Sequence, residues 1–200
     1  KIIVAAPAEG GDNPLTPREA ALLGWLATDG TVREQTVSHR GRLYGPYLRA
    51  FIRQSKPRYV GEIRVLVGSD GSEYVDAARQ RDFGTYVSDC LPSHSFELTS
   101  KFARELLAKA GWRHWTDLPR IVLTLSREAR AAMLDTMLKG DGSQNGYGRW
   151  VFGKKRKPGV MEAFELLVTL EGYALGRVQS SPGRAIPYRA IRRHRNRSCS

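Results

Sequence analysis

The sequence predicts an α+β protein built from two related lobes, and three observations support this class. Residues 20–30 and 132–142 share a pattern of small and apolar positions that ends in Asp-Gly, at an offset of 112 residues. Each copy is followed by strand-like residues, a Lys-Pro dipeptide (Lys56-Pro57 or Lys157-Pro158) and another helical stretch. Helices therefore alternate with pairs of strands, which favours antiparallel sheets over a doubly wound parallel sheet.

The elements of this fold are placed along the chain by the spacing of apolar residues. In the first lobe we expect helices at 16–29, 57–67 and 100–110, with strands within 31–54 and near 93–99. The second lobe is shorter and shows no obvious final helix. Its helices are expected at 126–141 and 158–172, and its strands at 149–155 and within 175–192.

Both repeat helices begin with capping signals and end at Asp-Gly. Thr16 and Glu19 are spaced for a capping box at the start of the first helix, and Ser126 is suited to cap the second. We expect Gly30 and Gly142 to adopt the left-handed conformation directly after the last turn.

Small side chains recur every four positions along one face of each repeat helix. They are Ala20, Gly24 and Thr28 in one copy, and Ala132, Thr136 and Gly140 in the other. Such a stripe allows two helix backbones to approach closely, while the larger apolar residues between them are buried within each lobe. We therefore expect the two helices to pack side by side and in parallel.

Parallel packing would bring Asp29 and Asp141 together at the two helix ends. A helix C-terminus is already partly negative, so two carboxylates there are unfavourable unless a cation binds them. Carboxylates, the backbone carbonyls of Thr28 and Gly140, and water are oxygen ligands that suit Mg²⁺. Bound divalent ions can activate water for attack on a phosphodiester. The isolated Asp70-Gly71 is more simply a turn.

The charge balance favours a polyanionic partner. The 200 residues include 32 Lys and Arg against 20 Asp and Glu, a formal net charge of +12. No apolar run reaches membrane-spanning length, and the first residues lack the apolar core of a signal peptide. Cys90 and Cys199 provide neither a disulfide framework nor metal-ligand spacing, which favours a reducing, cytoplasmic setting.

The two repeats also resemble a known family. Residues 22–30 (LLGWLATDG) and 134–142 (LDTMLKGDG) are similar to the two motifs of a LAGLIDADG, or dodecapeptide, homing endonuclease. Residues 52–57 (IRQSKP) and 96–107 (FELTSKFARELL) resemble segments of intein-borne members. The resemblance covers roughly residues 15–190. In the second motif, Asp135 and Lys139 are unusual, although both acids are kept.

The resemblance implies a monomer of two pseudo-twofold-related αββαββα lobes, with the motif helices packed at their interface. The antiparallel sheets would form a saddle in the major groove of double-stranded DNA. Asp29 and Asp141 would bind Mg²⁺, about two or three ions shared between them. The enzyme would cut both strands of a long, specific target across the minor groove and leave 3′ overhangs.

The resemblance also supplies candidate basic and polar residues at the cut. Lys101 would be a basic residue that flanks the acids in the first lobe. Gln54, Lys56 and Lys157 are further candidates near the cut phosphates. Simple phosphate contact or solvation explains these three residues about equally well.

Residues that would contact DNA are predicted from charge and alternation. Tyr47, Arg49, Phe51 and Arg53 alternate with Leu48, Ala50 and Ile52, so period two places the basic set on one face of a sheet. The full candidate set shares side chains that bind base edges or phosphates: Arg33, Gln35, Arg40, Arg42, Tyr47, Arg49, Arg53, Lys56, Arg149, Lys154, Lys155, Arg156, Arg177, Arg184, Arg189 and Arg192.

The domain limits and the alternatives complete the prediction. We expect an N-terminal extension or intein-junction remnant (1–14), a first lobe (15–115), a linker (116–125), a second lobe (126–192) and a basic tail (193–200). No splicing residues are evident, so the chain is either free-standing or an endonuclease part separated from intein splicing domains. The alternative function is a non-catalytic nucleic-acid binder, either an RNA maturase or a DNA-binding regulator. Retention of both acids disfavours it.

Overall fold

The protein divides into two compact units, which are described one at a time. One unit spans residues 29–106, and the other comprises residues 1–28 and 107–200. The computed structural model describes residues 10–77, 79–82, 87–144, 150–153, 157–179 and 188–193. Within 79–82, 87–90, 176–179 and 188–193 it describes the backbone alone. In this described part, no helix is long and apolar enough to cross a membrane.

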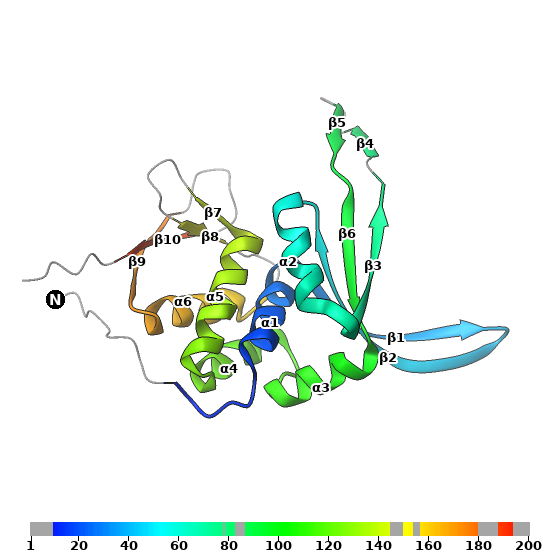
Figure 1. The fold of residues 1–200 in the computed structure, drawn as a ribbon, viewed down its shortest axis with the longest axis horizontal. Coiled ribbons are helices and arrows are strands. Elements are labelled where there is room, and N and C mark those ends of the chain that lie inside the picture. Colours follow the sequence, from blue (N-terminus) through cyan, green and yellow to red (C-terminus); the bar gives the residue numbers. More distant parts are fainter. Residues whose placement is uncertain are drawn as a thin grey trace, which may run out of the picture. The chain divides into compact units, whose positions relative to one another are not determined.

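The unit of residues 29–106 is built on an antiparallel four-stranded sheet in the order β1-β2-β6-β3. Its elements follow one another as β1 (Gly30–His39), β2 (Arg42–Gln54), α2 (Pro57–Val67), a short 3₁₀ turn η1 (Gly68–Asp70), β3 (Gly71–Asp76), β4 (Arg79–Asp82), β5 (Val87–Cys90), β6 (Ser93–Leu98) and most of α3 (Ser100–Ala110). Strands β4 and β5 pair with each other as a separate ribbon beyond β3 and β6 (Figure 1).

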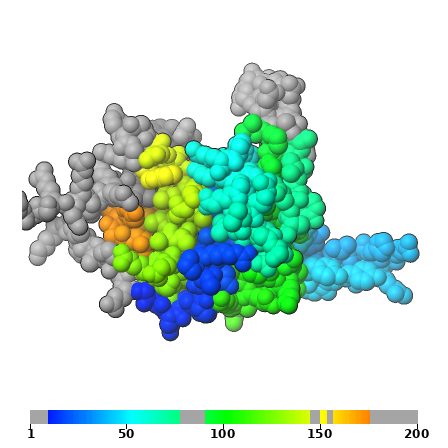
Figure 2. All heavy atoms as spheres, in the orientation of Figure 1, coloured from blue at the N-terminus to red at the C-terminus, as the bar shows by residue number. Residues whose placement is uncertain are grey.

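The β1–β2 hairpin is the longest feature of this sheet. His39 pairs with Arg42, so Arg40 and Gly41 form a two-residue turn with φ angles of 50° and 74°. Positive φ at both positions matches the right-handed twist of the strands. The outer half of the hairpin, drawn in light blue, projects from the rest of its unit (Figure 2).

Helix α2 covers one face of the sheet. Pro57 stands at its first turn, where a missing N–H is harmless. Its stripe of Val60, Ile63 and Val67 is buried, and the helix packs on β2, β3 and β6. Opposite it, Ile52 and Phe96 of the sheet are almost fully buried. These contacts make the core of the unit.

The second unit repeats this order of elements. It contains α1 (Pro17–Asp29, up to Thr28), the end of α3, η2 (Trp115–Asp117), α4 (Leu118–Thr124), α5 (Arg127–Asp141), β7 (Gly142–Gln144), β8 (Trp150–Phe152), α6 (Val160–Leu170), β9 (Tyr173–Gln179) and β10 (Tyr188–Arg193). Its sheet order, β7-β8-β10-β9, has the same connectivity as that of the first sheet. Two copies of an αββαββ arrangement therefore occur in the chain.

The core of the second unit includes the segment expected to be a linker. Within 116–125, helix α4 packs on α6, and Leu118, Ile121 and Val122 are buried. Phe152 of β8 stacks on Phe164 of α6 with ring centroids 3.9 Å apart. A described part of the expected N-terminal extension also joins this core, because the backbone N–H groups of Gly11 and Asn13 donate to carbonyls at the end of α4.

The predicted α+β class, with helices alternating with antiparallel strand pairs, is confirmed. All five expected helices are present with ends within about two residues. Strands β3, β4, β5 and β7 and helix α4 were not anticipated. The strand residues, such as Ser72-Glu-Tyr-Val-Asp76, lack a clear apolar alternation, and β3 is a strand because it pairs with β6.

Candidate metal and nucleic-acid site

The two repeat helices begin where their capping signals predict. The N–H of Thr16 donates to Glu19 Oε2 at 2.7 Å, and the N–H of Glu19 donates to Thr16 Oγ1 at 3.3 Å, which is the expected capping box. The hydroxyl of Ser126 accepts from the N–H of Ala129 at 3.2 Å. The starts of α1 and α5 are therefore set by local sequence.

Helices α1 and α5 meet through their small residues. A Cβ added to Gly24 would overlap the hydroxyl of Thr136, and one added to Gly140 would overlap Thr28. The Thr136 hydroxyl also donates to the carbonyl of Ala21 at 3.0 Å. Residue numbers increase together in the two contacts (24 with 136, 28 with 140), so the helices run in parallel. The predicted stripe is confirmed.

Asp29 ends α1 beside a buried amide. Gln54, at the end of β2, is only 3% exposed, and its Nε2 donates to Asp29 Oδ2 at 2.9 Å. The Gln54 carbonyl oxygen accepts from the N–H groups of Ser55 and Lys56 at 3.0 and 2.9 Å. Because the amide is held at both ends, it fixes the orientation of the carboxylate. Gln54 and Asp29, two predicted site residues, are brought into contact.

Asp141 ends α5, and the glycine after it behaves differently from our expectation. Gly142 has φ −79° and ψ 150°, an extended conformation, and Gly30 is not among the residues of positive φ. The left-handed ends were therefore wrong, because each helix passes directly into a strand. A side chain at position 142 would still be excluded, because an added Cβ would overlap the carbonyl of Leu138.

Asp135 and Lys139, which are unusual in the motif, form an i,i+4 ion pair at 2.6 Å.

Lys157 lies at the end of α1. Its ammonium nitrogen donates to the carbonyl oxygens of Leu26, Ala27 and Thr28 at 2.9, 2.9 and 3.2 Å. It also lies 4.2 Å from the ring centroid of Trp115. A cation here satisfies the last carbonyls of α1 and offsets the negative end of its dipole.

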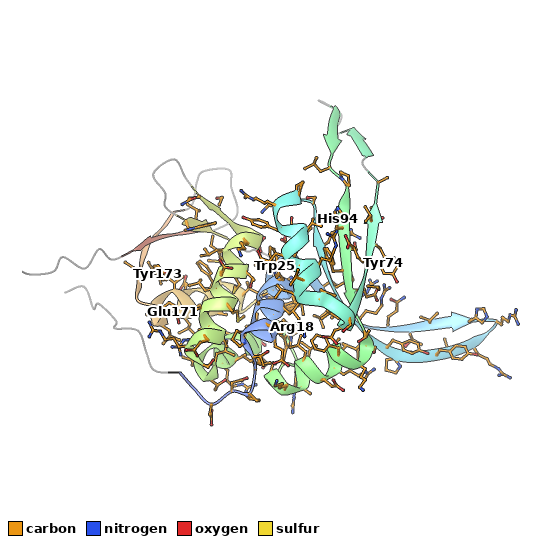
Figure 3. All side chains as sticks on the ribbon, viewed as in Figure 1. Arg18, Trp25, Tyr74, His94, Glu171 and Tyr173 are labelled. Atoms are coloured by element: carbon orange, nitrogen blue, oxygen red, sulfur yellow. The ribbon has the colours of Figure 1, made fainter. Side chains whose placement is uncertain are left out.

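The face of the first sheet turned away from α2 is polar and basic; we call it the open face. Register pairs Arg33 with Arg49, Phe51 with Glu97 and Arg53 with Ser95. Tyr74 of β3 belongs to the same face and is 60% exposed, whereas His94 of β6 belongs to the face under α2 (Figure 3). The predicted alternation along β2 is confirmed, since Ala50 and Ile52 are buried and Arg53 is exposed.

Arg49 is the most restrained cation of the open face. Its Nε and Nη2 each donate to a different oxygen of Glu97 at 2.6 Å, and its Nη1 donates to Gln35 Oε1 at 3.0 Å. The hydrogen bonds from Arg49 hold the pKa of Glu97 below its ordinary value, against the opposite effect of burial. The sequence analysis did not select Glu97. The register that places Glu97 of β6 opposite Phe51 comes from the structure, so the sequence carried no signal for it.

The remaining predicted residues with described side chains lie on the β1–β2 hairpin, in α3 and just before α2. Tyr47, Arg40 and Arg42 are exposed on the projecting β1–β2 hairpin. Lys101 is exposed in the first turn of α3 and makes no ion pair with the described residues. Lys56 precedes α2, with its ammonium 5.7 Å from the ring centroid of Tyr59.

Several predicted DNA contacts in the second lobe have no described side chain. Arg149, Lys154, Lys155, Arg156 and Arg184 lie outside the described residues. Arg177 is in β9, and Arg189 and Arg192 are in β10, where the backbone alone is described.

The residues at the two helix ends carry oxygen atoms, the ligand type that hard cations prefer. Asp29 and Asp141 each have a carboxylate, and Thr28 and Gly140 precede them with backbone carbonyls. Mg²⁺ commonly uses one or two carboxylates and retains several waters. Within the described residues there is no group of three or more His, Cys, Asp and Glu able to hold a metal ion.

Comparison with known proteins places the fold. No protein-family model and no curated protein matches the chain. Among solved structures, variants of the homing endonuclease I-DmoI match with a TM-score of 0.55 and 13% identity over 88% of this chain and 88% of theirs. The α+β architecture of this chain therefore matches the fold of this homing endonuclease.

Two further structures agree with this fold. I-WcaI bound to its DNA recognition sequence matches with a TM-score of 0.53 and 12% identity, over 86% of this chain and 74% of that one. A mutant of I-SmaMI matches with a TM-score of 0.52 and 12% identity, over 88% and 79%. At such identities the likeness concerns the fold.

Proposed function

We propose that this protein is a site-specific, Mg²⁺-dependent endonuclease that hydrolyses both strands of double-stranded DNA. The observation that carries the proposal is the contact of α1 with α5 at Thr28 and Gly140. Each of these residues is followed directly by an aspartate, Asp29 or Asp141. Two carboxylates can share a cation only if the helix ends that carry them lie close together. The small residues directly before the two aspartates allow this close approach.

Each residue of the proposed site has a role that its contacts support. Asp29 and Asp141 hold the ions, with the carbonyls of Thr28 and Gly140 as further ligands, and Gln54 orients Asp29 through the 2.9 Å hydrogen bond. When bound, Mg²⁺ supplies an activated water and stabilises the leaving oxygen.

The basic residues near this site divide by their contacts. Lys157 contributes positive charge at the end of α1, where its three hydrogen bonds hold the helix carbonyls. Lys56 and Lys101 are proposed to act at the cut phosphates. Of these, Lys101 is exposed.

The open face is proposed to lie in the major groove of the DNA. It offers arginine and glutamine side chains, which recognise guanine and adenine edges, and the exposed ring of Tyr74. The homing endonuclease resemblance further implies a monomeric enzyme that leaves 3′ overhangs. It also implies an endonuclease part of an intein as the origin of the chain.

The test is cleavage of a selected duplex. Sequences that bind the wild-type chain are enriched from a randomised double-stranded DNA library without divalent ions, and the enriched duplex is then incubated with Mg²⁺. We expect the wild type to cut both strands. Asp29→Asn and Asp141→Asn should each abolish cutting and leave binding largely intact, because the neutral amide lacks the negative charge that attracts the divalent ion.

Asp70→Asn is the matched control, because Asp70-Gly71 is an Asp-Gly pair at a 3₁₀ turn that belongs to neither repeat helix. It should cut like the wild type. A wild-type chain that binds the enriched duplex and never cuts it with Mg²⁺ would instead be the non-catalytic binder.

A further inference from the structure

The open face of the first sheet carries a neutralised arginine. Arg49 donates to both oxygens of Glu97 and to Gln35, as described above. The side chains remain accessible, 36% for Arg49 and 25% for Glu97. A carboxylate on a surface meant for DNA repels phosphates, so its presence there needs a reason.

The geometry leaves Arg49 with a defined set of donors. A guanidinium has five N–H groups. The bonds to Glu97 use the N–H of Nε and one of Nη2, and the bond to Gln35 uses one of Nη1. One N–H therefore remains on each terminal nitrogen, and two adjacent donors match the O6 and N7 acceptors of a guanine edge.

The pair also changes which DNA group Arg49 binds well. Because Glu97 cancels its charge, Arg49 gains little from the phosphate backbone, whose attraction depends on net positive charge. Base recognition depends instead on orientation, and an arginine held in advance loses less side-chain freedom when it binds. The pair thus favours reading a base over holding a phosphate.

We propose that Glu97 is a positioning residue for specificity, which holds Arg49 so that it reads a guanine in the target. The inference rests on the proposed DNA-binding function and extends it to one chemical contact. It assigns Glu97 and Gln35 to the support of Arg49, and it distinguishes Arg49 from Arg33. The guanidinium of Arg33 lies 6.0 Å from the ring centroid of Phe51 and forms no such bidentate pair with a described residue.

The same sheet provides a matched control. On the face under α2, Arg64 donates to both oxygens of Glu73 at 2.7 and 2.8 Å. Glu73→Gln therefore removes a carboxylate from a bidentate pair on the opposite face, where Glu73 Oε1 also lies 2.6 Å from His94 Nδ1. A general effect of weakening the sheet would appear in this variant as well as in Glu97→Gln.

The first experiment is base-preference profiling of the full chain on the randomised duplex library, without divalent ions. Arg49→Lys identifies the position that Arg49 reads, because lysine lacks the fork. We expect Glu97→Gln to lower the preference for guanine at that same position about tenfold, with preferences elsewhere unchanged. Glu73→Gln should keep the wild-type profile.

The second experiment measures affinity for poly(dA-dT) duplex, which contains no guanine, over a series of salt concentrations. Glu97→Gln uncovers one positive charge, so binding should become tighter and the log–log salt slope steeper by about one. If Glu97 positions Arg49, Glu97→Gln should therefore lower the preference for guanine in the library and raise the affinity for poly(dA-dT). A merely structural residue would weaken both.

The outcomes separate the two proposals. An unchanged guanine preference in Glu97→Gln, or weaker binding to both probes, overturns the role of Glu97 while the proposed function stands. A wild-type chain that selects no sequence and does not bind poly(dA-dT) overturns the DNA-binding function and this inference with it.

Discussion

The two faces of the first sheet carry the same kind of ion pair in different surroundings. Under α2, Arg64 and Glu73 join a helix to a strand beside buried Ile63 and Phe96. On the open face, Arg49 and Glu97 join two strands, and their side chains remain 36% and 25% exposed. The comparison shows that a bidentate pair does not by itself indicate stability or recognition; what covers the pair decides its role.

The difference follows from period two along each strand. Ile52 and Phe51 are neighbours in β2, yet Ile52 is fully buried and Phe51 is only partly covered. Alternate residues of β2 therefore lie in the core and on the open face. Substitutions on the two faces should separate stability from DNA binding.

The largest expected effect is on the face under α2. Ile52→Ala should lower the free energy of unfolding by about 2–5 kcal/mol, because it leaves a cavity in a closed core. Denaturant unfolding measures this. The adjacent Phe51→Ala should cost less stability and weaken binding to the enriched duplex. Equal losses of stability in the two variants would contradict the division between the faces.

A smaller effect concerns Glu73 and pH. Hydrogen bonds from Arg64 lower the pKa of Glu73 to about 2 from 4.5. A depressed carboxyl pKa contributes stability above the unfolded pKa, and this contribution is lost as pH falls from about 5 towards the folded pKa. Glu73→Gln should thus cost about 1–2 kcal/mol at pH 7, allowing for solvent screening.

The pH dependence provides the check on Glu73. Unfolding of the wild type and Glu73→Gln, measured over an acid pH series, should converge as the pH approaches about 2. A constant difference across the series would mean that packing, and not the charge of Glu73, is responsible. Glu97→Gln can be run beside it, since Arg49 also lowers the pKa of Glu97.

The smallest effect on stability is expected at Arg53. Its side chain is 60% exposed, and its nearest carboxylate oxygen, on Asp76, is 3.9 Å away. Arg53→Ala should change the free energy of unfolding by less than about 1 kcal/mol. If Arg53 binds a phosphate, the log–log salt slope of DNA affinity should fall by about one. An unchanged slope would remove Arg53 from the phosphate-binding set.

The candidate site was partly predictable from sequence because some of its signals are periodic. The stripe of Gly24, Thr28, Thr136 and Gly140 repeats every four positions, and it correctly indicated close, parallel helices. Gln54 was selected as well, and it donates to Asp29, while its role at the cut stays a prediction. The assignment of Asp29 and Asp141 to metal remains a prediction.

Other features had no local signal. Strand β3 forms because β6 offers a partner edge, and its own residues do not show a strand pattern. Gly142 was expected to be left-handed, whereas it is extended because it begins β7 and pairs with Phe152 of β8. In both cases a neighbour in space, and not the local residue pattern, determined the conformation.

The sequence by itself determined where the helices start, which residues of each helix are small, and how the side chains of β2 alternate. These properties depend on contacts within a few residues, so caps and periodicity encode them. Only the tertiary structure decided the partners of the charged groups. Lys157 reaches carbonyls about 130 residues earlier in the chain, and Glu97 reaches Arg49 across 48 residues. Such pairings depend on how strands and helices assemble, because charge alone favours many partners and geometry selects one.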